Sequence, residues 1–206
     1  MAFSAERSVA ATSVEVDRGG RPASTSAHEL AAAAQRLFLR DGFDETSVED
    51  IAAAVGVSRR TFFRYFPTKA DVVWVESDKE LDEFRRLLAA SISETDPIEI
   101  LVEAFISVVD HGRHEDEWAC GRAQLILEVP AVQARASEVY RQWRAVIAEF
   151  VGDRSDMPAT AIYPTAVAHA MMAASAAGHE QWIANPGRGL RASLAPMFAL
   201  MVPRRV

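Results

Sequence analysis

Residues 46–69 read "TSVEDIAAAVGVSRRTFFRYFPTK", and this stretch decides the fold of the first part of the chain. Thr46-Ser-Val-Glu49 has the spacing of a capping box, in which the threonine oxygen accepts from the amide three residues on and the glutamate reaches back. Gly56 suits a tight turn, and Ser58 is a favoured N-cap for a short helix after it. Two capped helices on either side of a tight turn predict a helix-turn-helix.

The second helix of this pair carries a concentrated positive charge. Residues 57–69 contain four cations and no acid, whereas the whole chain has a formal net charge of -7. On a wheel of about 100° per residue, Phe62 and Phe66 fall on one side and the arginines on the other. Arginine pairs with guanine edges as well as with phosphates, so this face is typical of a DNA recognition helix. A merely solvated surface is the alternative, but the aromatic Phe63 among the cations argues against it.

Each residue of this face has an expected role in binding double-stranded DNA. The arginines pair with bases or phosphates, and Thr61 contacts a thymine methyl or a phosphate. Thr46 and Lys69 lie at the expected N-termini of the second and fourth helices, where a phosphate is favoured. Tyr65 leans toward the core, so only its hydroxyl reaches the DNA backbone. The predicted DNA contacts are therefore Thr46, Arg59, Arg60, Thr61, Phe63, Arg64, Tyr65 and Lys69.

A further helix precedes the helix-turn-helix. Leu30, Ala34, Leu37 and Phe38 share one face of a segment that begins near Ser26 and stops at Gly42, which suits a left-handed cap. Three short helices with buried stripes therefore form a compact N-terminal module.

Composition sets limits on the rest of the chain. With 206 residues, half of them hydrophobic, the chain is long enough to bury a substantial core. The single Cys120 excludes an internal disulfide framework, and no apolar run is long enough for a membrane span. Residues 1–25 are rich in Ser, Ala, Gly and charge and lack the apolar core of a signal peptide, so we expect a flexible arm on a cytoplasmic protein.

Everything after the N-terminal module also predicts helices, so the fold class is all-α. Apolar residues recur with a period of 3.6, and no segment is typical of a strand. We expect a fourth helix that is capped by Thr68-Lys-Ala-Asp71 and runs to about Ala90, and a fifth that begins at Asp96-Pro97. Further helices are expected over 118–129, from Pro130, and over 166–182 and 190–201.

The C-terminal helices contain candidates for an apolar ligand cavity. Phe105, Trp118, Trp143, Met171 and Met172 could form its walls, and Arg113 and Arg122 could meet an anion at its mouth. Ordinary core packing remains the alternative for each aromatic or methionine residue, and surface solvation for each arginine.

The small and apolar residues of the last two expected helices predict a homodimer that forms through a four-helix interface. The first offers Ala166, Ala170, Ala173, Ala174 and Ala177 for close backbone approach, and the second offers Leu190, Leu194, Met197, Phe198 and Met201. The alternative is a core within one chain.

The sequence offers no candidate catalytic residues, cofactor motif or metal site. It contains no glycine-rich phosphate loop, serine elbow or paired carboxylates. His111 and His114 lie near acidic residues, but Gly112 interrupts the helical spacing that metal ligands normally use. We therefore expect neither an enzyme nor a metalloprotein.

The motifs "GVS" at 56–58, Thr61, "YFP" at 65–67 and Lys69 together resemble the DNA-binding domain of the TetR family of bacterial regulators. This resemblance implies a DNA-binding domain over residues 26–72 and a helical ligand-binding and dimerisation domain over 73–206. It also implies a homodimer that represses until a small molecule releases it from a palindromic operator. One departure is Phe63, where the family commonly has a tyrosine that donates to a phosphate.

The stretches "RRTFFRYFPTKADVVW" and "RAQLILEVPAVQARASEVYRQWRAVIAEFV" are also similar to the TetR-type regulators associated with the mycofactocin system. That similarity implies a long-chain acyl-CoA as the effector. Two other readings stay open: a DNA-associated dimer with no effector response and, more remotely, a helical acyl-binding enzyme.

Overall fold

The structure is a computed structural model that describes residues 26–92, 95–112 and 116–205. All of the regular elements in these ranges are helical, as the sequence predicts. The expected arm over residues 1–25 and Arg113 lie outside the described residues. The elements are α1 (Ala27–Asp41), α2 (Val48–Ala54), α3 (Arg59–Tyr65), the 3₁₀ helix η1 (Lys69–Trp74), α4 (Ser77–Ala89), α5 (Pro97–Val109), α6 (Asp116–Glu128), α7 (Pro130–Ser155), α8 (Ile162–Ala184), the 3₁₀ helix η2 (Pro186–Arg188) and α9 (Leu190–Met201).

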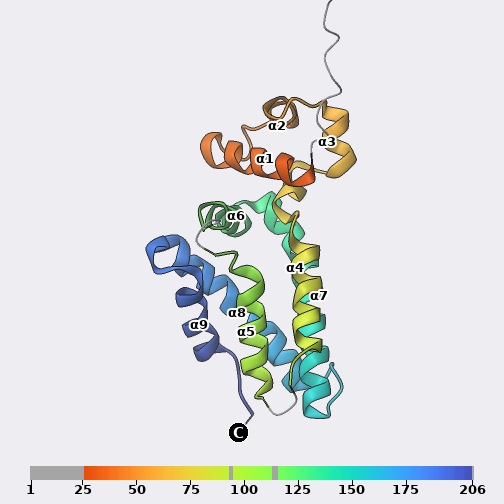
Figure 1. Cartoon of the computed structure of the whole chain (residues 1–206), viewed down its shortest axis with the longest axis vertical. Coiled ribbons are helices and arrows are strands. Elements are labelled where there is room, and N and C mark those ends of the chain that lie inside the picture. Colours follow the sequence, from red (N-terminus) through yellow and green to blue (C-terminus); the bar gives the residue numbers. More distant parts are fainter. Residues whose placement is uncertain (1–25, 93–94, 113–115, 206) are drawn as a thin grey trace, which may run out of the picture.

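The helices form two bodies arranged along the long axis of the molecule (Figure 1). Helices α1, α2 and α3 make a small body at one end, and α4, α5, α7, α8 and α9 make a larger bundle below it. Helix α6 crosses between the two, directly beneath α1. Any movement of α6 in the bundle therefore reaches the small body directly.

The helix-turn-helix begins one residue later than the sequence predicted. Ser47 caps α2, its hydroxyl accepting from the Asp50 amide at 3.1 Å while the Asp50 carboxylate accepts from the Ser47 amide at 2.9 Å. Thr46 is only 2 % exposed, and its hydroxyl donates to the Gly42 carbonyl oxygen at 2.8 Å. The expected box of Thr46 with Glu49 was therefore wrong, because Thr46 closes the turn between α1 and α2.

The turn and the third helix follow the prediction. Gly56 has a φ of +69°, a value that favours glycine, and the Val57 amide donates back to the Ala52 carbonyl oxygen at 2.9 Å. Ser58 caps α3 by accepting from the Thr61 amide at 3.2 Å. Phe62, which is fully buried, anchors α3 to the body behind it.

The predicted fourth helix is broken into two elements. Thr68 and Asp71 form the expected local hydrogen bonds, with the Thr68 amide donating to the Asp71 carboxylate at 2.8 Å. Val72 and Val73 of η1 are buried in the core of the small body, whereas Leu81, Phe84 and Leu88 of α4 are buried in the core of the bundle. The break between η1 and α4 therefore falls where the chain passes from one core to the other.

Two hydrophobic cores underlie the two bodies. The first core unites α1, α2, α3 and η1 and also includes Leu125 of α6 and Val132 of α7. The second core fills the bundle of α4 to α9. Trp74, at the end of η1, packs against both cores. Trp74 therefore lies at the junction of the small body and the bundle.

The last two helices pack mainly against each other within one chain. Gly178 of α8 lies so close to Leu194 of α9 that an added Cβ would meet the Leu194 Cα at 3.0 Å. Four of the residues expected at a dimer interface are instead buried in this core: Ala174, Leu190, Leu194 and Phe198. That part of the prediction was wrong, because α9 turns its leucine stripe toward its own chain.

Candidate DNA interface and ligand cavity

The cationic surface predicted on the third helix is formed in the structure. Arg59, Arg60 and Arg64 are exposed along α3, and Phe63 between them is 42 % exposed. Phe62 and Phe66 on the other side are 0 % and 5 % exposed. The faces are as predicted, and the geometry suits a helix that enters the major groove.

The three arginines differ in the contacts that their guanidinium groups make with other residues. The Arg59 Nε lies 3.3 Å from a carboxylate oxygen of Glu49, and its guanidinium lies 5.3 Å from the centre of the Phe63 ring. The Arg64 guanidinium lies 5.0 Å from the Tyr65 ring centre. Within the described ranges, Arg60 forms no ion pair, hydrogen bond or ring contact. The Arg60 guanidinium is therefore the one on this face that no other described residue occupies.

Two of the predicted DNA contacts have internal roles. Thr46 is buried and its hydroxyl already donates to Gly42, so its side chain is not presented to DNA. The Lys69 ammonium points at the carbonyl oxygens of Phe43, Asp44 and Thr46, at 2.6, 3.4 and 3.0 Å. An ammonium has three donors, so these carbonyls use all of them. The structure thus makes Lys69 an anchor for the loop between α1 and α2.

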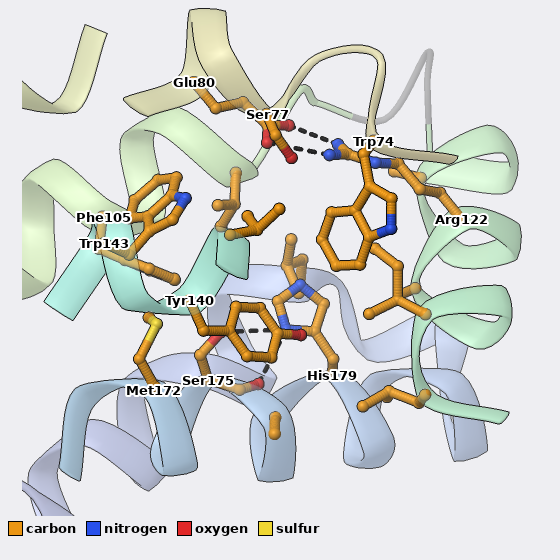
Figure 2. A pocket seen from close by; sticks show the side chains of 18 of the residues that line it. Trp74, Ser77, Glu80, Phe105, Arg122, Tyr140, Trp143, Met172, Ser175 and His179 are labelled. Carbon is orange, nitrogen blue, oxygen red and sulfur yellow. Dashed lines mark hydrogen bonds and ion pairs between the residues drawn. The ribbon is translucent and has the colours of Figure 1, made fainter. Parts of the chain in front are cut away.

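A cavity of about 100 Å³ lies inside the bundle, close to the junction with the first core. Helices α4, α5, α6, α7 and α8 form its walls, together with the end of η1 and the first residue of α9 (Figure 2). Most of its lining is apolar or aromatic, which is typical of a small-molecule site. Its larger lining side chains include Trp74, Phe105, Ile126, Tyr140, Trp143, Met172, His179 and Trp182.

The structure brings together part of the predicted ligand set. Phe105, Arg122, Trp143 and Met172 line the cavity. Met171 is fully buried in the second core and is not among the lining residues, because it lies on another face of α8. Trp118 does not line the cavity either. Its carbonyl oxygen accepts from the Gln35 side-chain amide of α1 at 2.6 Å, so Trp118 belongs to the contact between the two bodies.

Arg122 is not the solvent-facing anion receptor that the sequence predicted. It is 8 % exposed, and its guanidinium donates two hydrogen bonds to the carboxylate of Glu80, which is also 8 % exposed. Its Nε donates to the Val73 carbonyl oxygen of η1 at 2.9 Å. Figure 2 shows this pair at one side of the cavity. Arg122 therefore ties α6 to α4 and to the junction with the DNA-binding body.

The charge of Glu80 is stabilised by its partners. Burial alone would raise the pKa of this carboxyl, but the Arg122 charge and hydrogen bonds from His111 and Arg122 outweigh burial and hold the pKa at about 2. The His111 Nε2 lies 3.3 Å from the same carboxylate. Glu80 is therefore ionised at neutral pH and forms a buried ion pair.

Several cavity residues were missed from the sequence, and one of them left a detectable signal. Glu80 lies four and eight residues before Phe84 and Leu88, so it falls on the buried face of α4. An acidic residue in that register indicates a buried partner. Trp74, Ser175, His179 and Trp182 left no such signal, because their shared location depends on where η1 and α8 lie relative to each other in the folded chain.

A helix-turn-helix body coupled to a helical bundle with an internal cavity defines the class of one-component DNA-binding regulators. Residues 30–73 match the family model "Bacterial regulatory proteins, tetR family", and residues 95–205 match the model "MftR C-terminal domain". The chain belongs to the TetR family of transcriptional regulators and has a C-terminal domain of the MftR type. It is a regulator and not an enzyme.

Similar proteins agree with this assignment. A protein of Mycobacterium tuberculosis named as the mycofactocin biosynthesis transcriptional regulator MftR is 33 % identical over 181 residues, covering 88 % of this chain and 91 % of its own. The crystal structure of the repressor FadR from Thermus thermophilus, in complex with lauroyl-CoA, is 26 % identical with a TM-score of 0.57, covering 88 % and 97 %. The fatty acid degradation regulator FadR of Bacillus halodurans, at 18 % identity and a TM-score of 0.65 over 87 % and 96 %, shares the fold.

Within the described ranges, no helix is both long and apolar enough to cross a membrane.

Proposed function

We propose that this regulator is a repressor that binds a palindromic operator as a homodimer and is released by a long-chain acyl-CoA. The observation that carries the proposal is the position of Trp74, which lines the cavity and packs against both hydrophobic cores. A ligand that displaces this side chain disturbs the junction on which the DNA-binding body rests. Operator binding places the protein with the DNA in the bacterial cytoplasm.

Operator recognition is assigned to the exposed side of α3. Arginine side chains pair with guanine edges and phosphates, and Phe63 offers an apolar contact to a sugar or a thymine methyl. Loss of the hydroxyl that a tyrosine would supply at this position removes one phosphate hydrogen bond. The proposed contacts are Arg59, Arg60, Thr61, Phe63, Arg64 and the Tyr65 hydroxyl.

The homodimer is assigned to the outer faces of α8 and α9. Ala166 and Ala173 are exposed on α8, and Leu200 of α9 is 81 % exposed. Small residues let two copies approach closely, and an exposed leucine beside them gains stability when a second copy covers it. Sedimentation at micromolar concentration tests this assignment, and a monomer there contradicts it.

Helix α6 supplies the route from the cavity to the DNA-binding body. Arg122 and Ile126 line the cavity, while the Trp118 carbonyl oxygen of the same helix accepts from Gln35 of α1. On this helix Gly121 also lies against Leu39 of α1, since an added Cβ would meet the leucine Cδ1 at 2.5 Å. A ligand that shifts α6 thus moves α1 and with it the spacing of the two recognition helices in a dimer.

The size of the cavity bears on the acyl-CoA assignment. At about 100 Å³ it is smaller than the roughly 300–1,000 Å³ of typical small-molecule pockets, so an acyl chain must push the walls apart. That requirement favours a ligand that changes the arrangement of the bundle as it enters. The lauroyl-CoA complex of the similar T. thermophilus repressor supports this choice of ligand.

A gel-shift experiment tests the proposed function. The probe is the DNA that flanks the gene of this protein, incubated with the full chain and with increasing lauroyl-CoA or palmitoyl-CoA. We expect a retarded protein–DNA complex that dissociates on addition of acyl-CoA, whereas coenzyme A alone leaves the complex intact. A complex that persists at saturating acyl-CoA supports the other reading, a DNA-associated dimer without an effector response.

A further inference from the structure

The carboxylate and the guanidinium group that line the cavity are paired with each other. Among the described residues that line it, Glu80 is the one carboxylate and Arg122 is the one lysine or arginine. Both are buried, and they share two hydrogen bonds, with the Arg122 Nη2 3.0 Å from the Glu80 Oε2. His111 also directs its Nε2 at this carboxylate. The cationic group of the wall is therefore already neutralised before any ligand enters.

Two further polar groups of the lining, Tyr140 and His179, are uncharged at neutral pH. Burial raises the pKa of the Tyr140 hydroxyl, so it keeps its proton at neutral pH. Burial also lowers the pKa of His179, which favours the neutral imidazole. The His179 Nδ1 lies 2.8 Å from the Ser175 carbonyl oxygen, so Nδ1 carries the proton and Nε2 is left as an acceptor. In Figure 2 these groups lie across the cavity from the ion pair.

Two indole N–H groups add to this uncharged polar character. Trp74 and Trp182 line the cavity, and their Nε1 atoms are buried without an acceptor in the part of the chain that the structure describes. A buried donor without an acceptor is costly, and a neutral oxygen brought by a ligand would remove that cost.

From these observations we infer that Glu80 is a specificity-determining residue: by occupying Arg122, it restricts the cavity to ligands whose polar group is uncharged, such as an amide, ester or thioester. This inference rests on the proposed function, because it concerns the ligand of the same cavity. A ligand carboxylate would have to separate the buried pair and leave Glu80 with no matching charge, which is strongly unfavourable. A neutral carbonyl meets no such penalty.

A pair of nearly isosteric ligands tests the inference in the wild-type protein. Decanoate and decanamide have the same chain and a planar head group of the same size, but only decanoate is charged at pH 7.5. Isothermal titration calorimetry of the full chain without DNA measures both affinities. We expect decanamide to bind about a hundredfold more tightly, because only the carboxylate must break a buried ion pair.

Variants then assign the selectivity to Glu80. Glu80→Gln leaves the Arg122 charge unmatched, so we expect the affinity for decanoate to rise and the preference for decanamide to fall about tenfold or more. The double variant Glu80→Gln with Arg122→Gln removes both charges and should restore the preference for decanamide. Since the double variant leaves no unpaired buried charge, it also guards against a single variant that fails to fold.

Each outcome decides the question. Equal binding of the two ligands to the wild-type protein overturns the inference without any variant, and so does a folded Glu80→Gln protein with unchanged preference. If either of these results is obtained while lauroyl-CoA still dissociates the operator complex, the proposed function stands and only the role of Glu80 is lost. If neither decanoate nor decanamide binds and acyl-CoA leaves the operator complex intact, both proposals fail.

Discussion

At the scale of single residues, Arg60 is the side chain of the recognition helix that remains without a partner among the described residues, whereas Arg59 is shared with Glu49. We expect Arg60→Ala to weaken binding to the cognate operator by about 1–3 kcal/mol and to relax specificity at one position of each half-site. Fluorescence anisotropy with operator and random DNA measures both effects. The control is Arg36→Ala on the exposed side of α1. Equal losses on both DNAs for Arg60→Ala would mean that Arg60 only positions the protein.

For Lys69 we expect an effect on stability and not on DNA recognition, because its ammonium donates to three carbonyl oxygens of the loop between α1 and α2. Lys69→Ala leaves these acceptors without their charged donor, so we expect the free energy of unfolding to fall by about 1–3 kcal/mol. The slope of operator affinity against salt should stay unchanged, since no phosphate contact is lost. Thermal melting and binding at several salt concentrations measure the two quantities. A slope flatter by about one per half-site would instead show that Lys69 contacts a phosphate.

Glu80 links the cavity to acid stability. Its pKa is lowered from 4.5 to about 2 in the folded protein, so the folded state binds its proton less readily than the unfolded state. The resulting stability is present above about pH 4.5 and is lost as the pH falls toward 2, and the full shift corresponds to about 3 kcal/mol. We expect this acid-dependent loss to be smaller in Glu80→Gln, as measured by urea unfolding across this pH range. Glu103→Gln, at an exposed pair with Arg191, is the control and should leave the loss unchanged.

At the scale of elements, the contact between α8 and α9 depends on the absence of a side chain at Gly178. An alanine Cβ there would lie 2.6 Å from the Leu194 Cδ2 and 3.0 Å from its Cα, so the two helices must separate. We expect Gly178→Ala to destabilise the protein by about 1–3 kcal/mol despite the better helix propensity of alanine. The matched control is Gly187→Ala, where an added Cβ meets nothing within 4 Å. An unchanged melting temperature for Gly178→Ala would show that α9 adjusts freely.

At the scale of the whole molecule, the proposed release of DNA is a coupling between two sites and must act in both directions. If acyl-CoA weakens operator binding a hundredfold, the two ligands oppose each other by about 2.7 kcal/mol, which is within ordinary allosteric coupling. Saturating operator DNA should then lower acyl-CoA affinity by the same factor, which calorimetry measures directly. An acyl-CoA affinity that is unaffected by operator would contradict the route through Trp74 and α6 and leave the bundle as a dimerisation domain only.

The sequence by itself determined the helical class, the helix-turn-helix and the cationic face of α3. Caps such as Ser58, the turn at Gly56 and the position of Phe62 opposite the arginines all follow from neighbours within a few residues. Local spacing fixes such features before the chain packs, which is why the all-α class, the helix-turn-helix and the cationic surface were predicted correctly.

Only the tertiary structure decided which side chains meet across long separations. Arg122 pairs with Glu80 42 residues away, Lys69 reaches Phe43 26 residues away, and Gln35 reaches Trp118 across 83 residues. Periodicity shows that a residue is buried or exposed but not what it contacts there, so the arginine expected to meet an anion was found neutralised and the lysine expected on a phosphate was found holding a loop. The cavity arises in the same way, because its walls come from six helices and η1, whose relative positions no local pattern encodes.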